Sequence, residues 1–334
     1  MPYRLSFLDK SPLQANEAAA DALARTLSLA KAAEELGFAR FWVAEHHNAA
    51  KLASSSPEVL ISFLLAHTSR IRIGSGGVML QHYSAYKVAE NFNLLAALAP
   101  GRVDIGIGKA PGGMPLSTHA LQGAYDLARK PSFDTQLVEL DGFLREHHDG
   151  SDAGNRLAAF PAPAQPPDRF LLGASIESAR LAAGLGWGFV YPGHIHGDEA
   201  AMGEALSAYR AAGGTSALLA LGVVTAETDD LARSLAPDTR RFRVDIENGQ
   251  GVNVTSREQA LEYIRQTGSR EYRIEERSSL LLRGTPARIH AELKRLHRAF
   301  GIDEFIVDCP VNEGAWRLRT IELLAAEARA SLAA

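Results

Sequence analysis

The sequence predicts a (β/α)₈ barrel built as one domain over residues 1–334. Short apolar runs alternate with helices of 3.6-residue hydrophobic period, an order typical of a parallel sheet with right-handed crossovers. The pair repeats eight times, which favours a closed barrel over an open sheet. No Gly-x-Gly-x-x-Gly segment follows the first run, so a dinucleotide-binding open sheet is disfavoured.

The strands are expected where the short apolar runs occur. In chain order they cover residues 3–9, 38–44, 71–79, 103–108, 170–174, 188–191, 217–225 and 304–308. Several helix ends are marked as well. Gly37 stands where a C-cap glycine belongs, and Ser56 and Thr285 each precede a proline at a first helical position. A last helix is expected over residues 313–330.

Residues 240–283 interrupt this rhythm and predict an insertion between the seventh and eighth strands. A structureless loop of this length is uncommon unless it is functional. Ser256 opens a helical pattern, so part of the segment is expected to be ordered. Two interpretations stay open: a mobile lid over the barrel, or a peripheral insertion with its own helix.

Charge and cysteine content exclude several classes of protein. The chain has 35 Lys and Arg against 39 Asp and Glu, a net charge of -4, and so no basic field for a nucleic acid backbone. Cys309 is the only cysteine, which excludes a disulfide framework and a cysteine metal cluster. Neither a membrane-spanning apolar run nor a secretory N-terminus is visible. We expect a cytoplasmic protein without nucleic acid or membrane partners.

The uncommon residues follow the predicted strands, and in barrel enzymes the active site forms from these loops. The turns that enter the strands are plain Leu-Gly, Pro-Gly and Phe-Gly pairs. The segments after strands two to six are Glu45-His46-His47-Asn48, Gln81-His82-Tyr83, 109–113, 175–178 and 191–196. The C-terminal end of the barrel is therefore the predicted site.

Ser175 and Ser178 suggest a phosphate site at the start of the helix after the fifth strand. The first backbone N–H groups of a helix are free, and its dipole favours an anion. Lys109, on the neighbouring glycine-rich loop, adds a positive charge. Alone, Ser175 would be read as an N-cap; with Lys109, phosphate binding is favoured.

Glycines are concentrated in the third predicted strand, at Gly74, Gly76 and Gly77. Glycine weakens a strand and removes side chains from the barrel wall. Either a flat ligand approaches the backbone closely there, or the segment is a β-bulge without a ligand.

The histidines favour acid–base chemistry over metal binding. His46 and His47 are adjacent on a strand end and point to opposite sides, so they do not chelate one ion. His194 and His196 share a face, but the further ligands of a metal-dependent hydrolase barrel are missing from the pattern. No metal is expected. His46 is instead a candidate proton donor or acceptor, its alternative being a structural histidine.

Longer strings of the sequence resemble the luciferase-like monooxygenase family. They are Phe41 to Asn48 (FWVAEHHN), residues 54–60 (SSSPEVL), residues 71–83 (IRIGSGGVMLQHY), residues 87–90 (KVAE) and residues 100–104 (PGRVD). The match runs through the first two hundred positions and then thins. The resemblance implies an FMN-binding barrel with an active-site histidine.

The resemblance also implies roles for individual residues. His46 takes the place of the catalytic histidine, and Gly76-Gly77 that of a non-prolyl cis peptide under the flavin. Lys109 stands in place of a phosphate-binding arginine, while Ser175 and Ser178 match phosphate-binding hydroxyls. Glu45, His82, Tyr83, Tyr191 and His194 are expected near the flavin or substrate. Gly108 and Ala174 depart from luciferase, at its reactive cysteine and at an acidic residue, so light emission is not expected.

The predicted function is a two-component monooxygenase that oxidises a small organic substrate with O₂. A separate flavin reductase would supply reduced FMN (FMNH₂), because no nicotinamide motif is visible, and the resemblance favours a homodimer. Three alternatives are an oxidoreductase that uses the deazaflavin F420, a flavin-binding barrel without catalysis, and a metal-dependent hydrolase. The substrate itself has no signature in the sequence.

Overall fold

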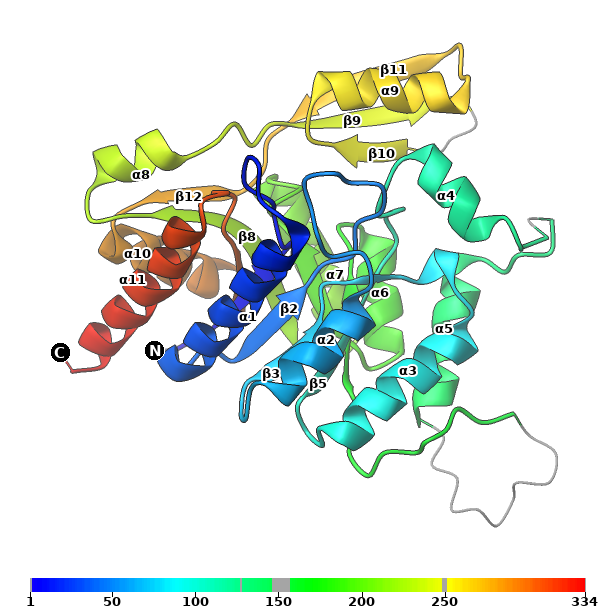
Figure 1. The fold of residues 1–334 in the computed structure, drawn as a ribbon, viewed down its shortest axis with the longest axis horizontal. Helices are drawn as coiled ribbons and strands as arrows, with labels where there is room; N and C mark the ends of the chain where they lie inside the picture. The colour runs from blue at the N-terminus through cyan, green and yellow to red at the C-terminus, as the bar shows by residue number, and fades with distance from the viewer. Residues whose placement is uncertain (1, 127, 146–156, 248–250, 334) are drawn as a thin grey trace.

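A computed structural model describes residues 2–126, 128–145, 157–247 and 251–333. Eight parallel strands close into a barrel, which confirms the predicted fold (Figure 1). In order around the barrel they are β1 (Arg4–Asp9), β2 (Arg40–Val43), β3 (Arg72–Ser75) with its continuation β4 (Val78–Met79), β5 (Val103–Gly108), β6 (Asp168–Leu172), β7 (Gly188–Pro192), β8 (Ala217–Thr225) and β13 (Glu304–Asp308). β13 pairs with both β8 and β1, which closes the ring.

Helices cover the outside of the barrel (Figure 1). They are α1 (Ala19–Leu36), α2 (Pro57–Ala66), α3 (Ala85–Leu98), α5 (Phe133–Arg145), α6 (Ile176–Gly184), α7 (Glu199–Ala211), α8 (Asp229–Leu235), α10 (Pro286–Phe300) and α11 (Gly314–Ala333), with the short η1 (Leu80–His82) and α4 (Pro115–Gln122) over the C-terminal end. The predicted helix ends are confirmed: α1 stops at Gly37, whose φ of 85° is costly for residues with a side chain.

Alternate strand residues build two apolar layers, as the two-residue period of a strand requires. Phe7 and Phe41 point outward into the core beneath the helices. Leu8 and Trp42, their neighbours in sequence, point inward with Phe170 and fill the barrel interior. The interior is therefore a packed core, and only its ends can hold polar groups.

Buried charges close the N-terminal end of the barrel. Arg40 lies 2.8 Å from Asp104 and 2.9 Å from Glu304, and Arg72 lies 2.7 Å from Asp104. The Trp42 indole N–H also donates to Asp104, at 2.9 Å. Asp104 thus accepts from three side chains, and this end of the barrel is a structural base.

The third strand is not continuous over residues 71–79, as predicted, but breaks between β3 and β4. The peptide between Gly76 and Gly77 is cis, as the family resemblance implied. A Cβ on Gly77 would lie 2.6 Å from the Gly106 carbonyl oxygen, so the backbones approach too closely for a side chain. The fifth strand is also displaced, to 168–172 from the predicted 170–174, because the chain must leave it to cap α6 at Ser175.

The insertion after α8 forms a small antiparallel sheet, β10-β9-β11, over the C-terminal end of the barrel (Figure 1). It consists of β9 (Arg241–Ile246), β10 (Gly251–Val254), α9 (Arg257–Thr267) and β11 (Tyr272–Arg277), and β12 (Leu281–Gly284) then returns to pair with β8. Ser256 caps α9, as predicted, by accepting from the Gln259 N–H at 3.2 Å. The sheet has its own apolar core, against which Met114 packs.

No described helix combines the length and apolar character that crossing a bilayer requires.

Candidate active site

The C-terminal ends of the strands bring together residues from almost the whole chain. The predicted groups there are His46 after β2, Lys109 after β5, Ser175 and Ser178 after β6, and Tyr191 and His194 at the end of β7. The insertion covers this end, and α4 contacts it through the Leu116 N–H, which donates to the Gln266 side chain at 3.1 Å. The site is thus formed between the barrel and the insertion.

His46 is a neutral imidazole with a free ring nitrogen. Its backbone N–H donates to the Ser54 carbonyl at 3.0 Å, which fixes the residue. Among the described residues its Nδ1 is buried and has no hydrogen-bond partner. Burial, and then the positive charge of Lys10, lower the pKa of His46 to about 4. At neutral pH the ring can therefore accept a hydrogen bond or a proton from a bound molecule.

His194, which follows β7, interacts with the same charged groups as His46, namely Lys10 and Asp308. Its Nδ1 is also buried without a partner among the described residues. Burial and Lys10 lower the pKa of His194 to about 3. Two neutral imidazoles consequently share the barrel mouth.

An ion pair between Lys10 and Asp308 lies beside these histidines and was missed by the sequence analysis. Lys10 Nζ is 2.6 Å from Asp308 Oδ2. Burial works against ionisation of Asp308, but the charge and hydrogen bond of Lys10, together with His194 and Arg317, outweigh it, and the pKa of Asp308 falls to about 2. No motif connects the two residues, because they are 298 positions apart in the chain.

Hydrogen bonds made by Glu45, His82 and Tyr83 connect the loops of the candidate site. The Glu45 carboxylate accepts from the Met79 N–H at 3.0 Å and the Tyr83 hydroxyl at 2.8 Å, and lies 2.7 Å from His47 Nε2. His82 Nε2 is 2.7 Å from the Pro111 carbonyl oxygen, and its Nδ1 is 2.9 Å from the Gln122 amide nitrogen. The predicted contact of these three residues with flavin or substrate stays a prediction.

The start of α6 offers several donors to an anion. Ser175 Oγ caps the helix by accepting from the Ser178 N–H at 3.2 Å, and the two hydroxyls are 3.3 Å apart. Lys109 is exposed, with Nζ 5.5 Å from the ring centre of Phe133. The Glu177 backbone N–H, the Ser175 hydroxyl and, more weakly, Arg180 and then Lys109 hold the pKa of Glu177 below its usual value. The predicted role of Lys109, Ser175 and Ser178 in binding a phosphate stays a prediction.

Tyr191 lines the wall of the barrel near its mouth. The residue is fully buried, and burial followed by the charge of Asp198 raises its pKa to about 12. Its hydroxyl therefore remains protonated at neutral pH and can only donate or accept a hydrogen bond.

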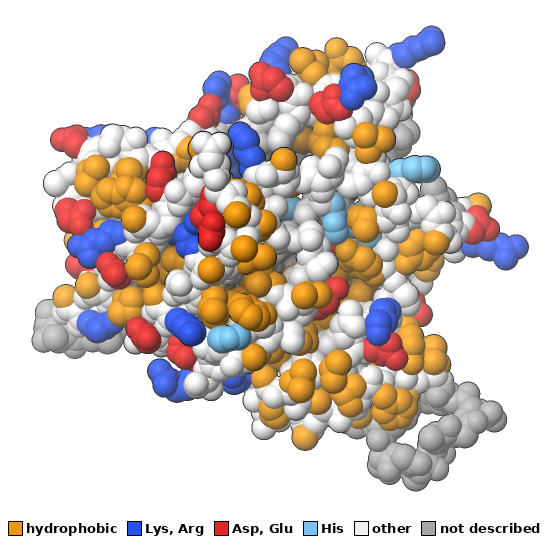
Figure 2. Space-filling view, in the orientation of Figure 1, with side chains coloured by type: hydrophobic (Ala, Val, Ile, Leu, Met, Phe, Trp, Pro, Cys, Tyr) orange, Lys and Arg blue, Asp and Glu red, His pale blue; other side chains and the backbone are white. Residues whose placement is uncertain are grey.

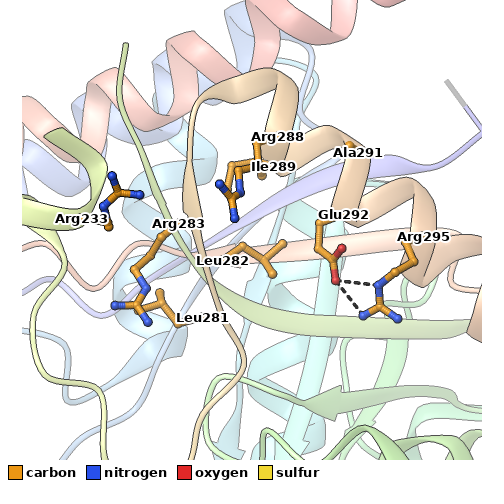
Figure 3. Close-up of a pocket in the computed structure, with 9 residues that line it drawn as sticks. All are labelled: Arg233, Leu281, Leu282, Arg283, Arg288, Ile289, Ala291, Glu292 and Arg295. Carbon is orange, nitrogen blue, oxygen red and sulfur yellow. Dashed lines mark hydrogen bonds and ion pairs between the residues drawn. The ribbon is translucent and has the colours of Figure 1, made fainter. Parts of the chain in front are cut away.

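A separate groove of about 740 Å³ lies between α8, β12 and α10 (Figure 3). It is lined by Arg233, Leu281, Leu282, Arg283, Arg288, Ile289, Ala291, Glu292 and Arg295. Arg288 and Arg295 are already paired, with Asp229 at 3.3 Å and Glu199 at 2.6 Å. The groove contains no residue of the strand-end loops that were predicted to form the site, so it is separate from the candidate active site.

Comparison with known proteins agrees with a barrel enzyme of this type. The family model for luciferase-like monooxygenases matches residues 4–303, and the chain belongs to that family of monooxygenases. It is 43% identical to the N-acetyl-S-alkylcysteine monooxygenase of Bacillus subtilis strain 168, covering 96% of this chain and 97% of the relative. It is 31% identical to a luciferase-like monooxygenase of Escherichia coli K12, covering 95% of each chain.

Solved structures agree at the level of the fold. The crystal structure of apo-MsnO8 aligns with a TM-score of 0.76 at 29% identity, covering 98% of each chain. The FMN complex of the oxygenating component of 3,6-diketocamphane monooxygenase from Pseudomonas putida aligns with a TM-score of 0.69 at 17% identity, covering 97% of each chain. At that identity the alignment shows the fold alone.

Proposed function

We propose that this protein is the oxygenase component of a two-component system that uses FMNH₂ from a separate flavin reductase. The observation that carries the proposal is the pairing, at one end of the barrel, of an anion site at Lys109, Ser175 and Ser178 with the neutral His46. Membership of the luciferase-like monooxygenase family supports it. A flavin-binding barrel without catalysis would have no need of a buried imidazole with an unpartnered nitrogen.

The residues present fit FMN. The N-terminus of α6, with the Ser175 and Ser178 hydroxyls and Lys109, would hold its phosphate. Gly76 and Gly77 present no side chain to the flavin ring, and a Cβ on Gly76 would lie 2.7 Å from Leu8. Bound FMNH₂ would supply two electrons, so that one atom of O₂ enters the substrate and the other leaves as water.

The chain's own residues would protect and complete this reaction. His46 Nδ1 would accept or hold a proton beside the flavin, a role that its neutral state at pH 7 permits. The β9–β11 sheet would act as a lid that keeps water out of the site. This is the lid interpretation of the insertion, and its position over the barrel mouth supports it.

For the substrate we propose a thioether of N-acetylcysteine. The support is the 43% identity, over almost the full length of both chains, to the N-acetyl-S-alkylcysteine monooxygenase. The added oxygen would stay on the sulfur as a sulfoxide, or enter the neighbouring S-alkyl carbon, in which case the C–S bond breaks to give an aldehyde and the free thiol.

Removing the phosphate donors is expected to weaken FMN binding. In the Lys109→Ala/Ser175→Ala variant, loss of a charged and a neutral hydrogen bond should raise the Kd by roughly 30-fold or more. Titration of wild type and variant with FMN, FMNH₂ and F420 measures this. Lys31→Ala, an exposed position on α1, is the matched control and should bind as wild type. Binding of F420 without either form of FMN would replace the oxygenase proposal with hydride transfer.

We also propose a homodimer that forms through α2 and α3. Large apolar side chains spaced four apart are exposed on both helices: Val59 (67%) and Phe63 (46%), Leu94 (51%) and Leu98 (67%). Figure 2 shows hydrophobic side chains gathered over the region of these two helices. Neighbouring apolar ridges of this kind are typical of subunit interfaces.

The double variant Phe63→Glu/Leu98→Glu is expected to convert the dimer to a monomer in light-scattering measurements. Two charges would be buried at the interface, whereas Lys31→Ala should leave the mass unchanged. A wild-type protein that is monomeric at all concentrations would contradict the proposal.

A further inference from the structure

The ion pair of Lys10 and Asp308 lies across the barrel from the candidate phosphate site. Going around the ring, β1 and β13 stand opposite β5 and β6. Lys10 follows β1 and Asp308 ends β13. The pair is largely buried, with side-chain exposures of 25% and 5%. The loop that carries Lys10 is fixed as well, since the Ala53 N–H donates to the Ser11 carbonyl at 2.9 Å.

Arg241, the first residue of β9, brings a second cation to this side from the insertion. Its side chain is half-buried and interacts electrostatically with Asp308, Asp238 and His194. Its Nη1 donates to the Arg240 carbonyl at 3.3 Å. Its neighbours are paired, Arg240 with Asp238 at 2.6 Å and Arg243 with Asp245 at 2.7 Å. Within the described part of the chain, Arg241 forms no ion pair of its own.

The charges around Asp308 do not balance. Lys10, Arg240, Arg241 and Arg317 provide four positive charges, whereas Asp9, Asp238 and Asp308 provide three negative ones. The two histidines here are neutral, and the Glu45 carboxylate is engaged elsewhere. One positive charge is thus left beneath the insertion. A half-buried cation without an ion-pair partner is incompletely compensated, so the site favours a bound anion.

We propose that Arg241, with Lys10 beside it, binds a carboxylate of the substrate. A guanidinium offers two parallel N–H donors that match a carboxylate, and Asp308 holds the Lys10 ammonium in place. The proposed site for the FMN phosphate lies on the opposite side of the barrel, so the phosphate and the substrate carboxylate would not compete. The inference rests on the proposed function and specifies its substrate class: a carboxylic acid, as the thioethers of N-acetylcysteine are.

The test compares an acid with its neutral amide. N-acetyl-S-benzylcysteine and its primary amide are titrated calorimetrically into the protein, with and without saturating oxidised FMN. The wild type should prefer the acid by about 10-fold or more. Arg241→Gln should weaken binding of the acid by roughly 10- to 100-fold and change binding of the amide less than about 2-fold. The affinity of Arg241→Lys for the acid should fall between those of wild type and Arg241→Gln. Arg240→Gln, which changes the paired neighbour, should bind both compounds as wild type does.

The inference is overturned if Arg241→Gln affects acid and amide equally, if it affects neither, or if the wild type binds neither compound. A folding defect would reduce binding of both compounds, so loss of the acid alone reports on the charge. FMN affinity of the same variants separates this inference from the proposed function. A wild type that prefers the acid but binds no FMN would keep the anion site and overturn the flavin proposal.

Discussion

The His46→Ala variant should bind FMN as tightly as wild type yet lose roughly 10²- to 10⁴-fold in kcat/KM for oxygenation, the usual contribution of a general acid–base. The imidazole is neutral, its Nδ1 has no partner among the described residues, and it does not belong to the phosphate site. Reduced flavin should still react with O₂ in the variant. Peroxide would then be released in place of oxygenated product, which a peroxidase assay measures beside product formation.

The pH dependence of kcat/KM tests the protonation state of His46 independently. Because burial lowers its pKa to about 4, wild-type kcat/KM should not decline near pH 6.5, where an exposed histidine titrates. The decline assigned to His46 is expected nearer pH 4 and should be absent in His46→Gln. His119→Ala, an exposed histidine of α4, should match wild type in both assays. Full oxygenation by His46→Ala would remove the acid–base role.

Asp104→Ala is expected to destabilise the protein by about 3–5 kcal/mol, the typical cost of leaving a buried charge unpaired. The change would deprive Arg40 and Arg72 of their shared carboxylate and the Trp42 indole of its acceptor. Urea unfolding followed by tryptophan fluorescence and far-UV circular dichroism measures the loss.

Asp168→Ala is the matched control, because its side chain is 49% exposed and also contacts Arg40 and Arg72, at 3.4 and 2.9 Å. This substitution should lower the free energy of unfolding by no more than about 1 kcal/mol, the usual contribution of an exposed ion pair. FMN affinity of the folded Asp104→Ala protein should be unchanged, since this base lies at the far end of the barrel from the candidate site. A loss below about 1 kcal/mol would mean that the network of charges does not stabilise the barrel.

The barrel could be predicted from the sequence because its strands and helices differ in hydrophobic period, and because capping residues and prolines mark the helix ends. The strands at 103–108, 217–225 and 304–308 agree with the prediction to the residue. The break at Gly76-Gly77 could not be placed from period alone, since it depends on how closely β5 approaches. The resemblance supplied the cis peptide, which the strand pattern did not.

The candidate site was predictable only where a loop carries several unusual residues together. His46, Lys109 and Ser175 stand in such segments. Lys10 and Asp308 do not: each is an ordinary charged residue at a strand end, and only closure of the barrel brings them to 2.6 Å. Arg241 is one of many arginines in a polar insertion, and only the structure shows that it forms no ion pair with another described residue.

The most direct test of the central claim is turnover with a separate reductase. The protein is combined with FMN, NADH, a flavin reductase, O₂ and N-acetyl-S-benzylcysteine, with catalase present to remove free peroxide, and the thioether and its products are quantified by mass spectrometry. We predict one oxygen-dependent product equivalent per thioether consumed, as sulfoxide or as free N-acetylcysteine, and none when FMN or the reductase is omitted. With His46→Ala the rate of product formation should be roughly 10²- to 10⁴-fold lower. Unchanged thioether under these conditions, together with oxidation or reduction of a substrate by F420 alone, would contradict the account.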